Sequence, residues 1–446
     1  MTGQTYDVEY TKLGEIYNPD RLEALLTACG DASSLLVLTH GWNNNMEEAR
    51  QLYNEWLASL RRVDSAASKI LPRTMVLQVF WPSKKFAAED LIAGGGAVGL
   101  SESDEVQLSL QALKQDPYLL GDHGPESTEP VWSNDINHAM GLVAQLEDSE
   151  QARREFVLHI RAALNPAEAH EDDASREFFE LEPEELFERF GDPVGIIDSG
   201  PGSRSAGGVG TTDFREEGGA AFLGGGWSKI KTAAVRIANY ATYYQMKSRA
   251  GLVGRNGLAQ TLELVRQRCP QLPIHLIGHS FGARAVVSAV AQMAPGKAPV
   301  SLSLLQAAFS HNGFAEKFDE KHDGAFRTVV QDRRATGPII ITHTKNDRAL
   351  GIAYPLASRI ARDNAAALGD KNDPYGGMGR NGAQHTPEVN TTEVFLRDWD
   401  TATPYKFSPG QVYNLQADRF INDHADVKGV EVAYATLQAM RSAVSA

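Results

Sequence analysis

One short segment constrains the fold of this chain more than any other feature. Residues 273–287 read PIHLIGHSFGARAVV, an apolar run that ends at Gly278-His-Ser-Phe-Gly282 and is followed at once by small residues. When a strand runs directly into a helix, the residue at the apex of the turn is exposed, and side chains two positions away on either side collide with the strand and the helix. Gly278 and Gly282 avoid that collision. The segment therefore predicts a strand, a sharp turn that exposes the Ser280 hydroxyl, and a helix.

The rest of the chain alternates between apolar β-rich runs and amphipathic stretches. Such an order predicts a mostly parallel central sheet flanked by crossover helices, which is an α/β fold. The expected strands are 35–39, 74–80, 273–277, 301–309, 337–344 and 411–417, and the expected helices include 46–60, 228–249 and 256–268.

The alternation is interrupted between residues 85 and 235. This segment contains several polar helical stretches and the glycine-rich run 198–227, so we expect a large, mainly helical cap or lid inserted before the strand of Ser280. The expected division is a first core part at 1–84, the insertion at 85–235 and a second core part at 236–446. The insertion's bulky apolar side chains could line an acyl pocket, but we expect them to form its own core: Trp132, Phe178, Phe179, Phe187, Phe222 and Trp227.

Composition excludes several classes of function. The net charge of −14 disfavours nucleic acid and anionic lipid as partners, and no apolar run is long enough to predict stable membrane insertion. The N-terminus resembles no secretory signal, and Cys29 and Cys269 are too few for a disulfide framework or a zinc cluster, so we expect a cytoplasmic protein. The glycine triplets 94–96 and 224–226 lack phosphate-loop and dinucleotide spacing, so neither a cofactor nor a metal is expected.

Three motifs together resemble the α/β-hydrolase superfamily. They are HGW at 40–42, GHSFGAR at 278–284 and HADV at 424–427, and they are similar to those of bacterial esterase-like and lipase-like members. The resemblance covers about residues 30–85 and 235–440, and it implies the α/β-hydrolase fold with a serine, an acid and a histidine in that chain order. Many relatives carry the cap after the strand that follows the serine, whereas here the corresponding connection, 310–328, is short.

The acid and the histidine can be sought separately. Asp347 follows the apolar run 337–344 in a turn-like context and is the expected acid, in preference to Asp332, Asp370 and Asp373. His424 is the histidine of the segment 411–440, which has the layout of a last strand, a loop and a C-terminal helix. The other histidines considered lie in strands, in the turn itself or in a loop: His275, His279, His343 and His385.

The same resemblance implies two backbone donors for an oxyanion. One is the N–H of Phe281, which follows the nucleophile, and the other is the N–H of Trp42 in the loop after the early strand. Gly41 permits a close approach of that loop, and His40 is expected to orient it rather than to react.

These features predict a serine hydrolase that cleaves small carboxylic esters through an acyl-enzyme, like a lipase or esterase. The same groups could act on an amide or a thioester, or could transfer the acyl group to an alcohol. A lipolytic effector and a non-catalytic scaffold that keeps the hydrolase fold are further alternatives. Epoxide and haloalkane hydrolysis are disfavoured because Ser280 stands where those enzymes use a carboxylate. The oligomeric state is not predicted.

Overall fold

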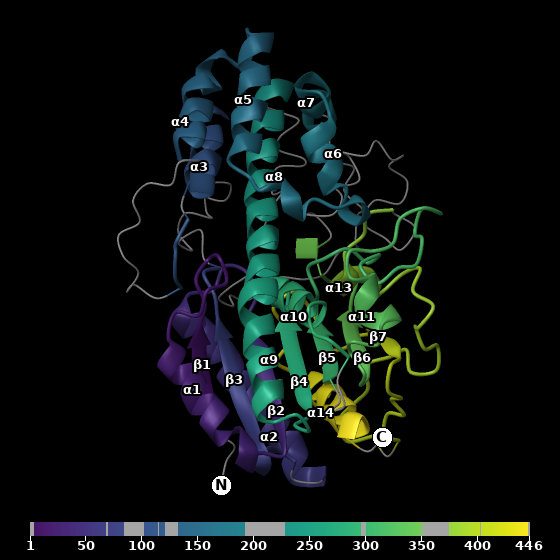
Figure 1. Ribbon diagram of the computed structural model, residues 1–446. Helices are drawn as coiled ribbons and strands as arrows, with labels where there is room; N and C mark the ends of the chain where they lie inside the picture. Colours follow the sequence, from purple (N-terminus) through teal and green to yellow (C-terminus); the bar gives the residue numbers. More distant parts are fainter. Residues whose placement is uncertain are drawn as a thin grey trace.

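The computed structural model describes residues 4–67, 70–83, 102–114, 116–120, 133–191, 228–295, 300–347, 349–350, 374–401 and 403–444. In this part of the chain a sheet lies between two layers of helices, and a group of helices stands beyond one end of the sheet (Figure 1). The glycine-rich run 198–227, with Trp132, Asp370 and Asp373, lies outside the described residues.

The sheet has seven parallel strands in the order β1-β3-β2-β4-β5-β6-β7. The strands are β1 (Thr5–Glu9), β2 (Ser34–Thr39), β3 (Thr74–Phe80), β4 (Ile274–His279), β5 (Val300–Leu305), β6 (Ile339–His343) and β7 (Val412–Gln416). The expectation of a mostly parallel α/β sheet is thus confirmed. Two details differ: β1 was not predicted, and β5 ends at Leu305 because Gln306 takes a φ of 44° and turns the chain.

Burial on both faces explains why the central strands read as continuous apolar runs. Every residue of β2 is buried, with Leu35 and Val37 in one core and Leu36 and Leu38 in the other. Successive side chains of a strand point to opposite faces, so helices must cover both. One face is covered by α1 (Pro19–Ala28), α9 (Ala259–Arg268) and α10 (Phe281–Val290), and the other by α2 (Met46–Ala67) and α14 (Val430–Val444). Two shorter helices are α11 (Arg327–Gln331) and α13 (Met378–Asn381).

The described part of the insertion is helical and has a core of its own. Its helices are α3 (Glu102–Lys114), α4 (Ser133–Leu142), α5 (Glu150–Ala162), α6 (Ser175–Glu180) and α7 (Pro183–Gly191), which pack around the first half of α8 (Lys229–Leu252) (Figure 1). Phe178 and Phe187 are buried in this core, and Phe179 packs against it half-buried. These phenylalanines therefore hold the insertion together, whereas Phe222 and Trp227 lie outside the described residues.

Helix α8 joins the insertion to the sheet domain. It is continuous across residues 235 and 236, where the sequence suggests a domain boundary. Its side chains belong to the insertion core up to Tyr244 and to the core of the sheet domain from Met246 onward. One long helix thus contributes to both hydrophobic cores.

The two cysteines form a disulfide bond. Cys29 follows α1 and Cys269 follows α9, and the bond connects positions 240 residues apart in the chain. The low cysteine count therefore no longer favours a reducing compartment, because disulfide bonds persist chiefly in oxidising ones. A cytoplasmic location stays a prediction. Among the described helices, none combines the length and the apolar character that crossing a membrane requires.

Candidate active site

The strand order creates a natural place for a site between β2 and β4. β3 lies on the far side of β2, whereas β5, β6 and β7 follow β4 in the opposite direction. In open parallel sheets, ligands bind outside the carboxyl ends of the strands where the order reverses in this way. The loop of His40, Gly41 and Trp42 leaves β2 at this point, and Ser280 leaves β4.

The turn at Ser280 has the strained geometry that the glycine pattern predicts. Ser280 has φ 54° and ψ −124°, and α10 begins at the next residue. A Cβ on Gly278 would lie 2.5 Å from Ala283 Cα, and a Cβ on Gly282 would lie 2.3 Å from Thr39 O. Any side chain at either position would therefore force strand, loop and helix apart. The two glycines allow the positive φ at Ser280 to be held by close packing.

Ser280, His424 and Asp347 form one continuous chain of hydrogen bonds. His424 Nε2 lies 2.8 Å from Ser280 Oγ, and His424 Nδ1 lies 2.8 Å from Asp347 Oδ2. Ser280 follows β4, Asp347 lies in the loop after β6, and His424 lies in the loop between β7 and α14. Residues up to 144 positions apart are thus brought together at the carboxyl ends of three strands.

The electrostatics of this chain favour a charged aspartate beside the imidazole. Asp347 is fully buried, and burial alone would raise its pKa, but His424 and the hydrogen-bond donors around the carboxylate lower it. Burial would likewise lower the pKa of His424, but the charge of Asp347 and its hydrogen bond raise it. Asp347 thus accepts from His424 Nδ1–H, which leaves Nε2 of the neutral ring as an acceptor toward Ser280.

Gln306 is a residue of the site that the motifs do not reveal. Its Nε2 donates to Asp347 Oδ2 (2.9 Å) and to Gly379 O (2.8 Å), and the N–H of Leu350 donates to Asp347 Oδ1 (3.0 Å). These contacts fix the carboxylate plane. Gln306 directly follows β5, and its place at that strand end is the only sequence signal that could have indicated it.

The loop after β2 lies directly against Ser280. A Cβ on Gly41 would stand 2.8 Å from Ser280 Cβ, so the backbone could not come this close with any other residue. His40 is fully buried, and burial lowers its pKa to about 4, so the ring is neutral near pH 7. Its ring stacks on Trp81 at 5.4 Å, and its Nε2 accepts from the Trp81 N–H (3.3 Å).

These contacts also orient the peptide between Gly41 and Trp42. Because His40 Nε2 is an acceptor, Nδ1 carries the hydrogen and donates to Gly41 O at 2.9 Å. Asn44 Nδ2 donates to the same oxygen at 3.2 Å. In a trans peptide the N–H points opposite to the C=O, so the Trp42 N–H is directed away from the His40 ring. His40 therefore acts on the backbone and makes no contact of its own with Ser280 among the described interactions.

His279 supports the loop of His424. Its Nε2 donates to the backbone oxygen of His424 at 2.8 Å, and the two rings lie 4.9 Å apart. Burial, followed by the nearby His424, lowers the pKa of His279 to about 3, so it stays neutral. The sequence assigns this position no role beyond the turn.

Three of the other candidate aspartates and histidines lie away from the hydrogen-bonded group of Ser280, His424 and Asp347. Asp332 pairs with Arg334, His275 contacts Ser301 inside the sheet, and His385 contacts Asn312. None of the three contacts Ser280, Asp347 or His424 within the described part of the structure.

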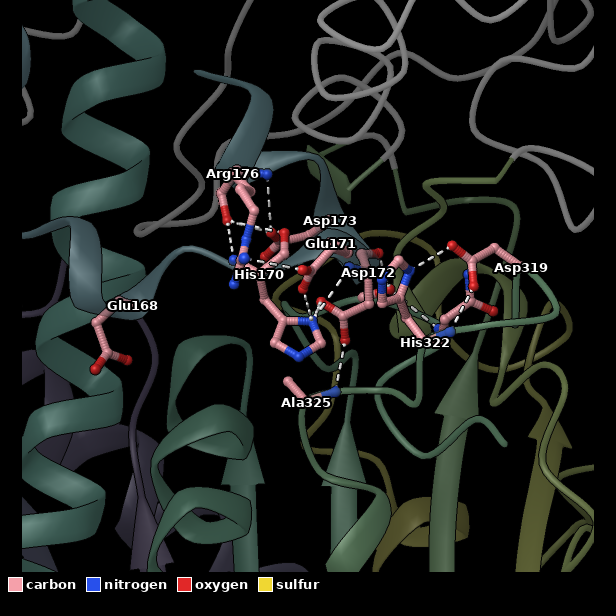
Figure 2. Close-up of polar contacts among 12 residues, drawn as sticks. Glu168, His170, Glu171, Asp172, Asp173, Arg176, Asp319, His322 and Ala325 are labelled. Atoms are coloured by element: carbon pink, nitrogen blue, oxygen red, sulfur yellow. Dashed lines mark hydrogen bonds and ion pairs between the residues drawn. The ribbon is translucent and has the colours of Figure 1, made fainter. Parts of the chain in front are cut away.

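The insertion is attached to the loops beside the site. Asp172 is buried at the end of the insertion that faces the sheet, where it accepts from the Ala325 N–H at 3.1 Å and contacts His170 Nδ1 at 3.2 Å (Figure 2). Its backbone oxygen accepts from Ser310 Oγ at 2.5 Å, in the segment after β5. That segment also contacts the turn itself, because the Ala308 N–H donates to Ser280 O at 3.1 Å.

Comparisons with protein-family models, with curated proteins and with solved structures find no match to this chain.

Proposed function

We propose that this protein is a serine hydrolase that cleaves carboxylic esters through an acyl-enzyme. The observation that carries the proposal is the hydrogen-bonded chain from Ser280 through His424 to the buried Asp347. A serine hydroxyl is a weak nucleophile unless a base takes its proton, and this arrangement supplies the base and an orienting anion.

In the first step, Ser280 Oγ attacks the ester carbonyl carbon while its proton passes to His424 Nε2. Asp347 remains ionised, holds the imidazole by its Nδ1–H and stabilises the imidazolium that forms. The raised pKa of His424 favours this proton transfer.

The negative charge that develops on the carbonyl oxygen is stabilised by hydrogen-bond donors that are already in position before the reaction begins. The Phe281 N–H opens α10, a position where the helix offers no acceptor, and the Trp42 N–H is directed away from the His40 ring. We assign both as the oxyanion donors, each worth about 3 kcal/mol of the barrier. The close approach of Gly41 to Ser280 supports the assignment of Trp42.

The tetrahedral intermediate then collapses. His424 gives its proton to the leaving alcohol, and the acyl group stays on Ser280 as an ester. A water molecule then attacks the acyl carbonyl carbon while one of its protons passes to His424 Nε2. As the second tetrahedral intermediate collapses, the bond to Ser280 Oγ breaks, His424 returns the proton to that oxygen, and the acid leaves. No cofactor takes part in this sequence of steps.

We further propose that the chain has the α/β-hydrolase fold with the insertion as a cap. The reversal of strand order between β2 and β4, the strand-turn-helix at Ser280 and the chain order serine, aspartate, histidine support this assignment. The contacts of Asp172 with the segment after β5 support the assignment of the insertion as a cap, because they attach it at the carboxyl ends of the strands (Figure 2). In this position it would cover the acyl part of a small ester.

A substrate panel tests the proposal. Nitrophenyl esters of increasing chain length, a matched anilide, a thioester and phospholipid vesicles are offered to the wild type, to Ser280→Ala and to His424→Ala. We expect rapid release of the first equivalent of nitrophenol from a short ester by the wild type, and a loss of kcat of at least about 10³-fold in both variants. Ester hydrolysis that persists in Ser280→Ala would contradict the proposal. If the wild type prefers the anilide, the thioester or the vesicles, the same mechanism would be assigned to amides, thioesters or phospholipids in place of small esters.

A further inference from the structure

The helical insertion brings together three side chains that bind transition metals. Asp135 and His138 lie three residues apart on α4, and His159 lies on α5, which packs against α4. Positions i and i+3 lie on the same face of a helix, so both side chains of α4 can reach the same point. Beside them, Ile136 of α4 and Ile160 of α5 are buried in the insertion core and hold the two helices in register.

The ligand atoms of these residues already converge. His159 Nδ1 lies 2.9 Å from Asp135 Oδ1, and the rings of His138 and His159 lie 4.9 Å apart at an angle of 24°. One ligand atom from each of the three residues falls within 4.8 Å of the other two. Among the described residues, no other group of three or more histidine, cysteine or carboxylate ligands comes this close.

An ion pair accounts for only two of the three residues. His159 and Asp135 satisfy one another, whereas His138 stacks on His159 and takes no part in that pair. A metal ion would engage all three residues, because each ring can donate an electron pair to it from one nitrogen while the carboxylate supplies an oxygen.

The donor set also selects the kind of ion. Two imidazole nitrogens and one carboxylate oxygen suit Zn²⁺ and its transition-metal neighbours, whereas Ca²⁺ and Mg²⁺ prefer sites made of oxygen. Around a tetrahedral Zn²⁺ the ligand atoms stand about 3.3 Å apart, given bonds of about 2.0 Å. The His159–Asp135 pair, at 2.9 Å, lies slightly closer than that spacing, and a ligand atom of the exposed His138 lies within 4.8 Å of both.

We propose that Asp135, His138 and His159 form a binding site for Zn²⁺ or a similar divalent transition metal, with water in the fourth position. The ion would link α4 to α5 and brace the insertion beyond the carboxyl ends of the strands (Figure 1). The site shares no residue with Ser280, Asp347 or His424, so it depends on neither the proposed hydrolysis nor its mechanism.

The test is calorimetric titration of ZnCl₂ into the chelator-treated full-length protein, compared with His138→Ala and His159→Ala. His322→Ala is the matched control, because His322 pairs with Asp319 at 2.7 Å in a surface turn that holds no second imidazole. We expect one equivalent of Zn²⁺ to bind the wild type and the control alike. Each ligand variant should bind at least about tenfold more weakly. His138 is exposed, so its removal leaves the packing of α4 intact.

Hydrogen exchange gives an independent readout. Zn²⁺ should slow exchange in peptides from 133–162 in the wild type and leave them unchanged in His138→Ala. Failure of the wild type to bind Zn²⁺, or binding that is equally strong in both ligand variants, would overturn the proposal.

Discussion

Asp347 carries a negative charge in a fully buried position, and its neighbours explain how it can. His424 Nδ1, Gln306 Nε2 and the Leu350 N–H contact its two carboxylate oxygens at 2.8 to 3.0 Å. A buried carboxylate without such donors would take up a proton instead. The hydrogen bond from His424 Nδ1 to Asp347 also fixes the tautomer in which Nε2 faces Ser280 as an acceptor. The charged, buried Asp347 therefore also makes His424 a better base.

The first prediction concerns the pH profile. Because Asp347 raises the pKa of His424, kcat/KM on a short ester should fall with decreasing pH through a pKa above 6.5, the ordinary value for histidine. In Asp347→Asn the anion is lost, so this midpoint should move to lower pH and kcat should drop about 10⁴-fold. Steady-state kinetics between pH 5 and pH 9 would measure both. An Asp347→Asn enzyme with the wild-type midpoint would mean that Asp347 does not act on His424.

Gln306 provides the second prediction. Gln306→Leu removes one hydrogen bond to the charged carboxylate, an interaction worth about 1.5–3 kcal/mol, so kcat should fall about tenfold or more while KM stays unchanged. Gln384→Leu is the control, because the Gln384 side chain bonds to Asn381 O and has no described contact with Asp347. Equal losses in the two variants would indicate a general packing effect instead of a positioning role.

The elements next to the site depend on close backbone contact. β4, the turn and α10 meet the loop after β2 at distances that only glycine allows. α10 is buried along its whole length, so it cannot shift outward to make room for a larger residue. The position of the Ser280 hydroxyl therefore follows from how the strand, the helix and the loop pack.

This packing gives the third prediction. In Gly282→Ala the new Cβ would lie 2.3 Å from Thr39 O and 2.4 Å from His40 O, so we expect a loss of about 2–3 kcal/mol in unfolding free energy, together with a displaced loop and reduced activity. Gly141→Ala is the matched control, because Gly141 is an exposed position of α4 where the Cβ would meet nothing within 4 Å. Urea unfolding measures both variants. A Gly282→Ala protein as stable and active as the wild type would refute this description of the turn.

The elbow and the order of elements could be predicted from sequence because their signals are local. A strand followed by Gly-x-Ser-x-Gly and small residues specifies its own turn, and buried parallel strands show as apolar runs. β1 was not predicted because the expected strands were identified as apolar runs, whereas its five residues, TYDVE, alternate polar and apolar side chains, which is the pattern of a half-buried strand at a sheet edge. Gln306 escaped because its role comes from a contact 41 residues away in sequence, which no spacing records.

At the scale of the whole molecule, long-range contacts connect the insertion and the first strands to the rest of the chain. Lys247 of α8 is buried and pairs with Asp173 of the insertion, and Lys12 near β1 pairs with Asp116 at 2.6 Å. The disulfide bond between Cys29 and Cys269 adds a covalent connection between the ends of α1 and α9. Sequence alone could not pair two cysteines 240 residues apart, because the pairing depends on α1 and α9 lying side by side on the sheet.

The fourth prediction follows from this connection. The double variant Cys29→Ser/Cys269→Ser should lose about 2–5 kcal/mol of unfolding free energy, because the unfolded chain is no longer constrained by a long closed loop. A thiol-free reductant should lower the urea midpoint of the wild type and leave that of the double variant unchanged. A wild type that shows two free thiols and no response to reductant would contradict the disulfide bond and would favour the cytoplasmic location expected from the cysteine count.

The central claim is that Ser280 is an activated nucleophile, and covalent labelling tests it most directly. The wild type and Ser280→Ala are treated with a fluorophosphonate, and the intact masses and labelled peptides are measured. We predict a single adduct on Ser280 in the wild type and none in Ser280→Ala, with slower labelling in His424→Ala. A folded wild type that remains unlabelled, or that is labelled equally in Ser280→Ala, would contradict it.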